Sequence, residues 1–294
     1  MKYTKPPLAF DQQADLLIGR GLIADKNLLI ERLKAVNYFR LSGYLYNFRN
    51  PDDTYKPGTT LEKVCRTYTF DRQLRLFVLD AIERIEVAVR TGLIYHHSHV
   101  FGPFGYLDGT TLPLLTKEKF FSLQGKLNEA VRQSEEEFIS HFQKKYSDSH
   151  ASPPLWMVGE VMSFGMMFTF FRGVDRNIKK PISREYGVAF GVLESWLHSL
   201  NAIRNICAHH SRLWNRVIGV KPMIPDKDPR WHSPVAVPID RMFAILTILK
   251  YLLGYVAPQS LWPQRFQELL QRYSEIPLSL MGFPANWKEC PIWK

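Results

Sequence analysis

The segment from residue 189 to residue 212 carries the residue types best suited to acid–base and phosphate chemistry. Six polar residues recur there at steps of three or four: Glu194, His198, Asn201, Asn205, His209 and Arg212. On a helix this spacing makes one continuous polar stripe, because residues three or four apart share a face. Asparagine, histidine and arginine donate hydrogen bonds in fixed geometry, and imidazole titrates near neutral pH. An ordinary solvent face would be dominated by Lys, Glu and Gln, so this stripe indicates binding or catalysis.

The C-terminal part of the stripe contains the heptad RNICAHH, residues 204–210. Asn205 and His209 are one turn apart, and the long side chain of Arg204 can reach a group held beside His209. A guanidinium grips a phosphate and stabilises charge in the transition state. An imidazole accepts a proton from a ribose 2′-OH or donates one to a leaving 5′-oxygen. Asn205 would position the Arg204 and His209 side chains. These residues predict metal-independent cleavage of RNA, which carries its own nucleophile.

Structural interpretations of the same residues remain open. Arg204, Asn205 and His209 would also suit a buried polar network that ties helices together. Glu194, His198 and Asn201 either form a second layer behind the site or face solvent. His210 points toward the apolar side of the helix, where a packed histidine is as reasonable as a catalytic one. A zinc site that combines Cys207 with the two histidines is disfavoured, because residues on one helix do not converge on a tetrahedral centre. We expect no metal and no other cofactor.

The stripe belongs to a chain of 294 residues with 38 Lys and Arg against 28 Asp and Glu, a net charge of +10. This excess favours a polyanionic partner, either nucleic acid or an anionic membrane surface. The three cysteines are far apart and fit neither a disulfide framework nor a zinc module, which favours the reducing cytoplasm. The N-terminus lacks the apolar stretch of a signal peptide, and the longest apolar runs are interrupted by Glu160 and Lys250. We therefore expect a cytoplasmic protein that does not bind membranes.

Apolar residues recur at helical spacing along most of the chain, and no convincing strand pattern is present, so we expect an all-α fold. The expected helices cover residues 11–21, 25–36, 59–97, 117–146, 155–171, 189–212, 239–256 and 263–273, and residues 38–49 read as aromatic and irregular. We expect an N-terminal helical and aromatic segment, residues 1–58, packed on a main body of residues 59–294, with one continuous domain as the alternative.

Basic and aromatic residues near the heptad form a candidate RNA-binding rim. Its members are Arg212, Trp214, Arg216 and Lys221, with Arg176, Lys179 and Lys180 from the preceding basic stretch. Cations track phosphates and aromatic rings stack on bases, although such a stretch is more commonly a solvated face.

Four segments together resemble the Abi-like family of AbiD/AbiF abortive-infection proteins. They are FRLSGYLYNFR (39–49), FDRQLRLFVLDAIERIEVAVRT (70–91), PLWMVGEVMSFG (154–165) and LNAIRNICAHHSRLWNR (200–216), and the resemblance extends over about residues 8–275. It implies a helical bundle of the HEPN type with additional N-terminal helices, a role as a toxin in bacterial phage defence, and RNA as substrate or ligand. Arg204, Asn205 and His209 match the Arg-Asn-x-x-x-His form of the HEPN ribonuclease motif.

HEPN sites are commonly composite, with two motifs facing each other, so one good copy implies a homodimer. Arg90 and His96, with Thr91 at the asparagine position, form a weaker second candidate, for which a charged helix end followed by a histidine-rich turn is the alternative. Glu160 lies in an apolar helix and requires a cationic partner. Besides a nuclease, the resemblance allows a non-catalytic protein that holds a structured small RNA. It also allows a protein–protein module that senses a phage component.

Overall fold

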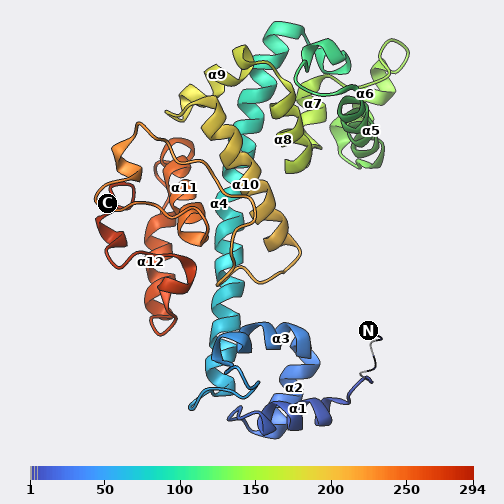
Figure 1. The fold of residues 1–294 in the computed structure, drawn as a ribbon. Helices are drawn as coiled ribbons and strands as arrows, with labels where there is room; N and C mark the ends of the chain where they lie inside the picture. The colour runs from blue at the N-terminus through green and yellow to red at the C-terminus, as the bar shows by residue number, and fades with distance from the viewer. Residues whose placement is uncertain (1, 3, 5) are drawn as a thin grey trace. The chain divides into compact units, whose positions relative to one another are not determined.

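The computed structural model describes residues 2, 4 and 6–294 and confirms the predicted all-α class. The α-helices are α1 (Phe10–Gly19), α2 (Lys26–Val36), α3 (Tyr38–Leu45), α4 (Leu61–Phe101), α5 (Lys117–Gln133), α6 (Glu137–Tyr146), α7 (Leu155–Glu160), α8 (Phe164–Gly173), α9 (Arg176–Glu185), α10 (Phe190–Ala208), α11 (Met242–Val256) and α12 (Trp262–Arg272) (Figure 1). Between the described residues, β-pairing is limited to two isolated bridges, Ile23 with Thr60 and Arg49 with Tyr55. No helix in this part of the chain has both the length and the apolarity needed to cross a bilayer.

The chain divides into two compact units. The first comprises the residues up to Leu76 together with Phe266–Pro277, and the second comprises Phe77–Arg265 and Leu278–Lys294. The long helix α4 contributes residues to both units.

In the first unit, side-chain caps mark the starts of α2 and α3. The carboxylate of Asp25 accepts a hydrogen bond from the Leu28 amide at 2.9 Å, as expected for the predicted start of α2. Asn37 has a φ of 72° and accepts a hydrogen bond from the Phe39 amide at 2.8 Å. This residue ends α2 and caps α3, so the expectation that the segment after it is irregular was wrong as far as Leu45.

In the second unit, two predicted helices are each divided in two. Residues 117–146 form α5 and α6, because the backbone at Ser134 and Glu136 is extended and interrupts the helix. Residues 155–171 form α7 and α8, because the Ser163 hydroxyl accepts a hydrogen bond from the Met166 amide at 3.3 Å and starts a new helix. Helix α10 lies against α8, α9 and α11 and buries its apolar face, including Trp196, Leu200 and Ile203.

Candidate functional site

The N-terminal half of the polar stripe on α10 is engaged in helix packing. The Glu194 carboxylate forms an ion pair with Lys179 of α9 at 2.6 Å and lies 3.8 Å from the Arg172 guanidinium of α8. The His198 ring stacks on Phe168, with the ring centroids 5.2 Å apart and an interplanar angle of 16°. Asn201 is half-buried. Glu194 and His198 were expected either to form a second layer behind the site or to face solvent. In the structure, both contact neighbouring helices.

The C-terminal end of α10 differs from the prediction, because the helix ends at Ala208 and not at Arg212. His210 adopts a left-handed φ of 56°. Its amide donates to the Cys207 carbonyl, and the Ser211 amide donates to the Ile206 carbonyl, both at 3.0 Å. This is the Schellman arrangement, which closes a helix end by returning two amides to its last carbonyls. Arg212 therefore lies beyond the helix and does not continue the stripe.

Asn205 and His209 are both exposed at this end of the helix. Arg204 is half-buried, and its Nη1 donates to the Asn205 Oδ1 at 3.5 Å, a long hydrogen bond. The structure thus places the guanidinium beside the amide and leaves the imidazole in solvent. Asn205 and His209 are therefore open to solvent, and Arg204 is partly so.

Helix α4 adds a carboxylate that the sequence analysis did not single out. Burial raises the pKa of Glu86, and the positive charges of Arg90 and Arg204 offset part of that increase. Arg204 therefore lies within the field of Glu86, which also forms an ion pair with Arg90. The sequence signal was the i, i+4 spacing of Glu86 and Arg90, but the proximity of Arg204 comes from tertiary packing.

The weaker candidate pair, Arg90 and His96, is held by different partners. Arg90 pairs with Glu86 and donates to the Met162 carbonyl at 3.0 Å. His96 lies 3.6 Å from the carboxylate of Glu185. These contacts hold both side chains within the second unit, where the Arg90 Nε is buried without a hydrogen-bond partner among the described residues.

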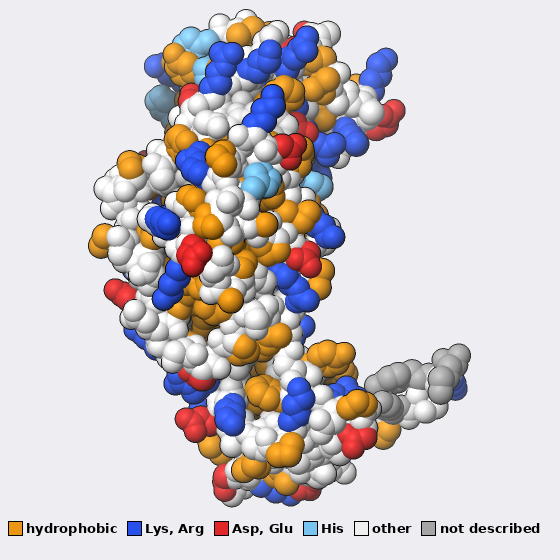
Figure 2. All heavy atoms as spheres, turned by 60° about the vertical axis from the view of Figure 1, so that its left-hand side comes forward, with side chains coloured by type: hydrophobic (Ala, Val, Ile, Leu, Met, Phe, Trp, Pro, Cys, Tyr) orange, Lys and Arg blue, Asp and Glu red, His pale blue; other side chains and the backbone are white. Residues whose placement is uncertain are grey.

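The residues of the candidate RNA-binding rim occupy unlike environments. Lys179 and Trp214 are buried, and Lys179 is paired with Glu194 as described. Arg176, Lys180 and Lys221 are exposed, whereas Arg212 and Arg216 are half-buried and Arg216 donates to the Arg212 carbonyl at 2.7 Å. On the face drawn in Figure 2, Lys and Arg side chains gather toward the upper end, at the level of α9 in Figure 1.

Glu160 ends α7 and is exposed, and it lines a cavity of about 440 Å³ with Tyr95, His99 and Trp156. Among all the described residues, no three His, Cys, Asp or Glu side chains are grouped closely enough to hold a metal ion.

The fold and the site define an all-α protein that presents an arginine, an asparagine and a histidine where one helix ends at the surface. The family model described as Abi-like protein matches residues 31–215, which is more than half of the chain and includes this site. The protein belongs to the Abi-like family, which places it in abortive infection, a form of bacterial phage defence. No curated protein and no solved structure matches the chain.

Proposed function

We propose that this protein is a metal-independent endoribonuclease of the HEPN type that acts as a toxin in phage defence. The observation that carries the proposal is the arrangement at the end of α10. Asn205 and His209 are exposed there, and the Arg204 guanidinium is hydrogen-bonded to the Asn205 side chain. Membership of the Abi-like family supports the defence role.

In the proposed reaction, His209 accepts the proton of a ribose 2′-OH, and the 2′-oxygen attacks the adjacent phosphorus. The bond from phosphorus to the 5′-oxygen breaks, and an imidazolium donates a proton to that leaving oxygen. The products are a 2′,3′-cyclic phosphate and a 5′-hydroxyl, so atoms and charges balance. Arg204 stabilises the additional negative charge on the phosphoryl oxygens in the transition state.

Glu86 and Asn205 would give Arg204 a defined orientation before RNA binds. The guanidinium lies in the field of the Glu86 carboxylate and contacts the Asn205 amide oxygen. A pre-oriented guanidinium loses less side-chain entropy when it takes hold of a phosphate. In this proposal, Glu86 is a positioning residue and does not touch the RNA.

The exposure of Asn205 and His209 is the reason to propose a homodimer. A site that is open to water has weak electrostatic interactions, because the solvent screens them. A second copy packed on the same surface would exclude water and supply a second imidazole as the general acid. Each site would then be completed by residues of both copies.

The test is digestion of single-stranded RNA in the presence of EDTA. We expect wild-type cleavage to persist, and His209→Ala to reduce the rate by about 10²-fold or more, the usual contribution of general acid–base catalysis. His141→Ala is the matched control, because His141 is an exposed histidine on α6. Loss of wild-type cleavage on chelation, or equal rates for wild type and His209→Ala, would refute the proposal.

A non-catalytic RNA-binding function is the second candidate. It is favoured by the exposed row of Arg176, Lys180 and Arg184 on α9, which would add phosphate affinity without any role in cleavage. In that case the purified protein carries a discrete RNA that stays intact on incubation. A protein free of RNA that degrades added RNA would exclude this candidate.

A further inference from the structure

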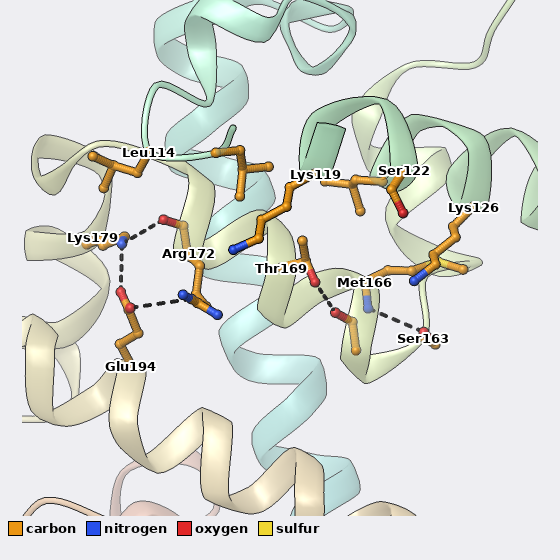
Figure 3. A pocket seen from close by; sticks show the side chains of 13 residues that line it. Leu114, Lys119, Ser122, Lys126, Ser163, Met166, Thr169, Arg172, Lys179 and Glu194 are labelled. Atoms are coloured by element: carbon orange, nitrogen blue, oxygen red, sulfur yellow. Dashed lines mark hydrogen bonds and ion pairs between the residues drawn. The ribbon is translucent and has the colours of Figure 1, made fainter. Parts of the chain in front are cut away.

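A cavity of about 680 Å³ lies between α5 and α8 in the second unit (Figure 3), and no residue of the heptad lines it. Its walls come from the loop before α5, from one face of α5, from α8, and from one residue each of α9 and α10. This volume lies within the range of about 300–1,000 Å³ that is typical of sites for small molecules.

Helix α5 contributes three polar side chains from one of its faces to the wall of the cavity. Lys119, Ser122 and Lys126 follow one another at steps of three and four, so they share the helix face that lines the cavity. In Figure 3, the Lys119 side chain extends toward Arg172 and Thr169 of α8, and the Lys126 amine lies near Met166. Within the described chain, neither ammonium group has an ion pair or a hydrogen bond, so both are available to a ligand.

The opposite wall adds more positive charge, and its single carboxylate is already neutralised. The Glu194 carboxylate is paired with Lys179 at 2.6 Å and lies 3.8 Å from Arg172. Lys179 is only 3% exposed in its side chain and also donates to the Arg172 carbonyl at 3.0 Å, so its position is fixed. The lining thus contains four cations and one carboxylate, and Lys119, Lys126 and Arg172 leave a net excess of positive charge.

Part of the remaining lining is apolar, and the rest is Ser163, Gly165 and Thr169. Leu114, Leu115, Leu123 and Met166 lie alongside the cationic groups. A site for an inorganic anion alone would not need this surface, whereas a molecule with a phosphate group and a planar ring would use both. Flexible lysines act as point charges toward phosphate oxygens, and a polyphosphate matches a triple excess of charge better than a single carboxylate does.

We propose that this cavity binds a free phosphorylated nucleotide, with its phosphates held by Lys119, Lys126 and Arg172 and its base against the leucines and Met166. None of its lining residues belongs to the heptad, and the wall at Gly165 lies beside the polar stripe, where an added Cβ would be 3.8 Å from the Asn201 Oδ1. Glu194 and the C-terminal end of α10 are roughly 20 Å apart along the helix axis, at 1.5 Å per residue. Helix α10 therefore connects a nucleotide site at one end with the exposed Arg-Asn-His group at the other.

The experiment is isothermal titration of the full-length protein with ATP as the probe, in EDTA, using the His209→Ala protein so that nuclease activity does not interfere. We expect saturable binding that weakens as salt is added, because partly exposed charges are screened. The double variant Lys119→Glu with Lys126→Glu should weaken binding by about tenfold for each lysine. Lys117→Glu with Lys144→Glu is the matched control, because it makes the same charge change at exposed lysines outside the lining.

Inorganic phosphate and a short oligoribonucleotide are titrated in parallel. ATP binding that is much tighter than phosphate binding, and that is lost only in the Lys119 and Lys126 variant, supports the proposal. Equal affinities for ATP and phosphate would refute a nucleotide site. Absence of ATP binding would overturn the proposal, and oligoribonucleotide binding that is lost in the double variant would assign these cations to RNA instead. ATP binding that survives in the double variant, with circular dichroism showing an intact fold, would also overturn it.

Discussion

Two of the segments that resemble the Abi-like family meet in a buried polar cluster of the first unit. The Tyr44 hydroxyl of α3 donates a hydrogen bond to the Asp71 carboxylate of α4, and Arg75 forms an ion pair with the same carboxylate. Asp71 is 0% exposed and Arg75 is 5% exposed. Burial, followed by the charge of Asp71, raises the pKa of Tyr44 above its ordinary value, so the phenol keeps the proton that it donates. These residues support the fold and take no part in the proposed chemistry.

Asp71→Asn tests this assignment, because it preserves side-chain size and removes the charge. The guanidinium of Arg75 would then remain buried without the carboxylate that neutralises it. Breaking a buried ion pair by removing one partner costs about 3–5 kcal/mol. Tyr44→Phe leaves the ion pair intact and removes the hydrogen bond to Asp71 together with a long one, at 3.4 Å, that the hydroxyl accepts from Arg75, so we expect a smaller loss of about 2 kcal/mol.

The assay must report on the first unit, and tryptophan fluorescence cannot, because all seven tryptophans are at or after Trp156 and lie in the second unit. Hydrogen exchange in residues 26–45, followed by mass spectrometry, measures the opening free energy of α2 and α3 directly. We expect that free energy to fall by the amounts given above.

Asp11→Asn is the matched control in the same unit. Its carboxylate pairs with Lys26 at 2.9 Å but is 62% exposed, so its loss should cost at most about 1 kcal/mol. An effect of Asp71→Asn as small as that of the control would refute the reasoning about burial.

Three further predictions concern the second unit. Burial lowers the pKa of His97 to about 4, so the folded state favours the neutral ring. The resulting contribution to the free energy of unfolding, roughly 3 kcal/mol, is present above the ordinary histidine pKa of about 6.5 and is lost as the pH falls toward 4. Urea unfolding followed by tryptophan fluorescence should show this loss, and His97→Gln should flatten the pH dependence. Gly282 has a φ of 80°, and a Cβ there would lie 2.4 Å from the Cβ of Arg241. Gly282→Ala should therefore cost at least about 2 kcal/mol in the same assay, and an unchanged midpoint would contradict this close packing. If the proposed function is correct, Arg204→Lys should lower RNA cleavage by about 10²-fold, since an ammonium cannot reproduce the planar fork of a guanidinium. A rate near that of wild type would show that only charge is needed there.

The sequence predicted those helix features that depend on nearby side chains. The start of the predicted helix at residue 25 and the apolar side of the predicted helix over residues 189–212 are local signals, and the structure has a cap at Asp25 and an apolar face around Trp196. The end of α10 was missed because His210 takes up a left-handed conformation that only a small fraction of non-glycine residues adopts. The division between α7 and α8 was missed because apolar residues continue on both sides of the Ser163 cap.

The environment of the candidate site was less predictable than its residues. The periodicity of α10 placed Glu194 and Asn205 on one face, but periodicity does not say what packs against each part of a helix. Lys179 and Arg172 surround Glu194, whereas Asn205 remains exposed. The proximity of Glu86 to Arg204 joins residues that are far apart in sequence, so it could only come from the tertiary structure.

The way in which α10 ends limits how the exposed site can interact with a ligand. The amide of His209 donates to the Asn205 carbonyl, and the next two amides donate to the carbonyls of Cys207 and Ile206. Three of the last carbonyls of the helix are therefore already satisfied by backbone amides, and an anion gains nothing from approaching this negative end of the helix dipole. Attraction of a phosphate to this position must come from side chains, and Arg204 is the cation of the heptad. Its guanidinium acts against the helix dipole, and it shares the field of Glu86 with Arg90. In the proposed homodimer, a second copy that brings its own Arg204 to the same surface would add to phosphate binding.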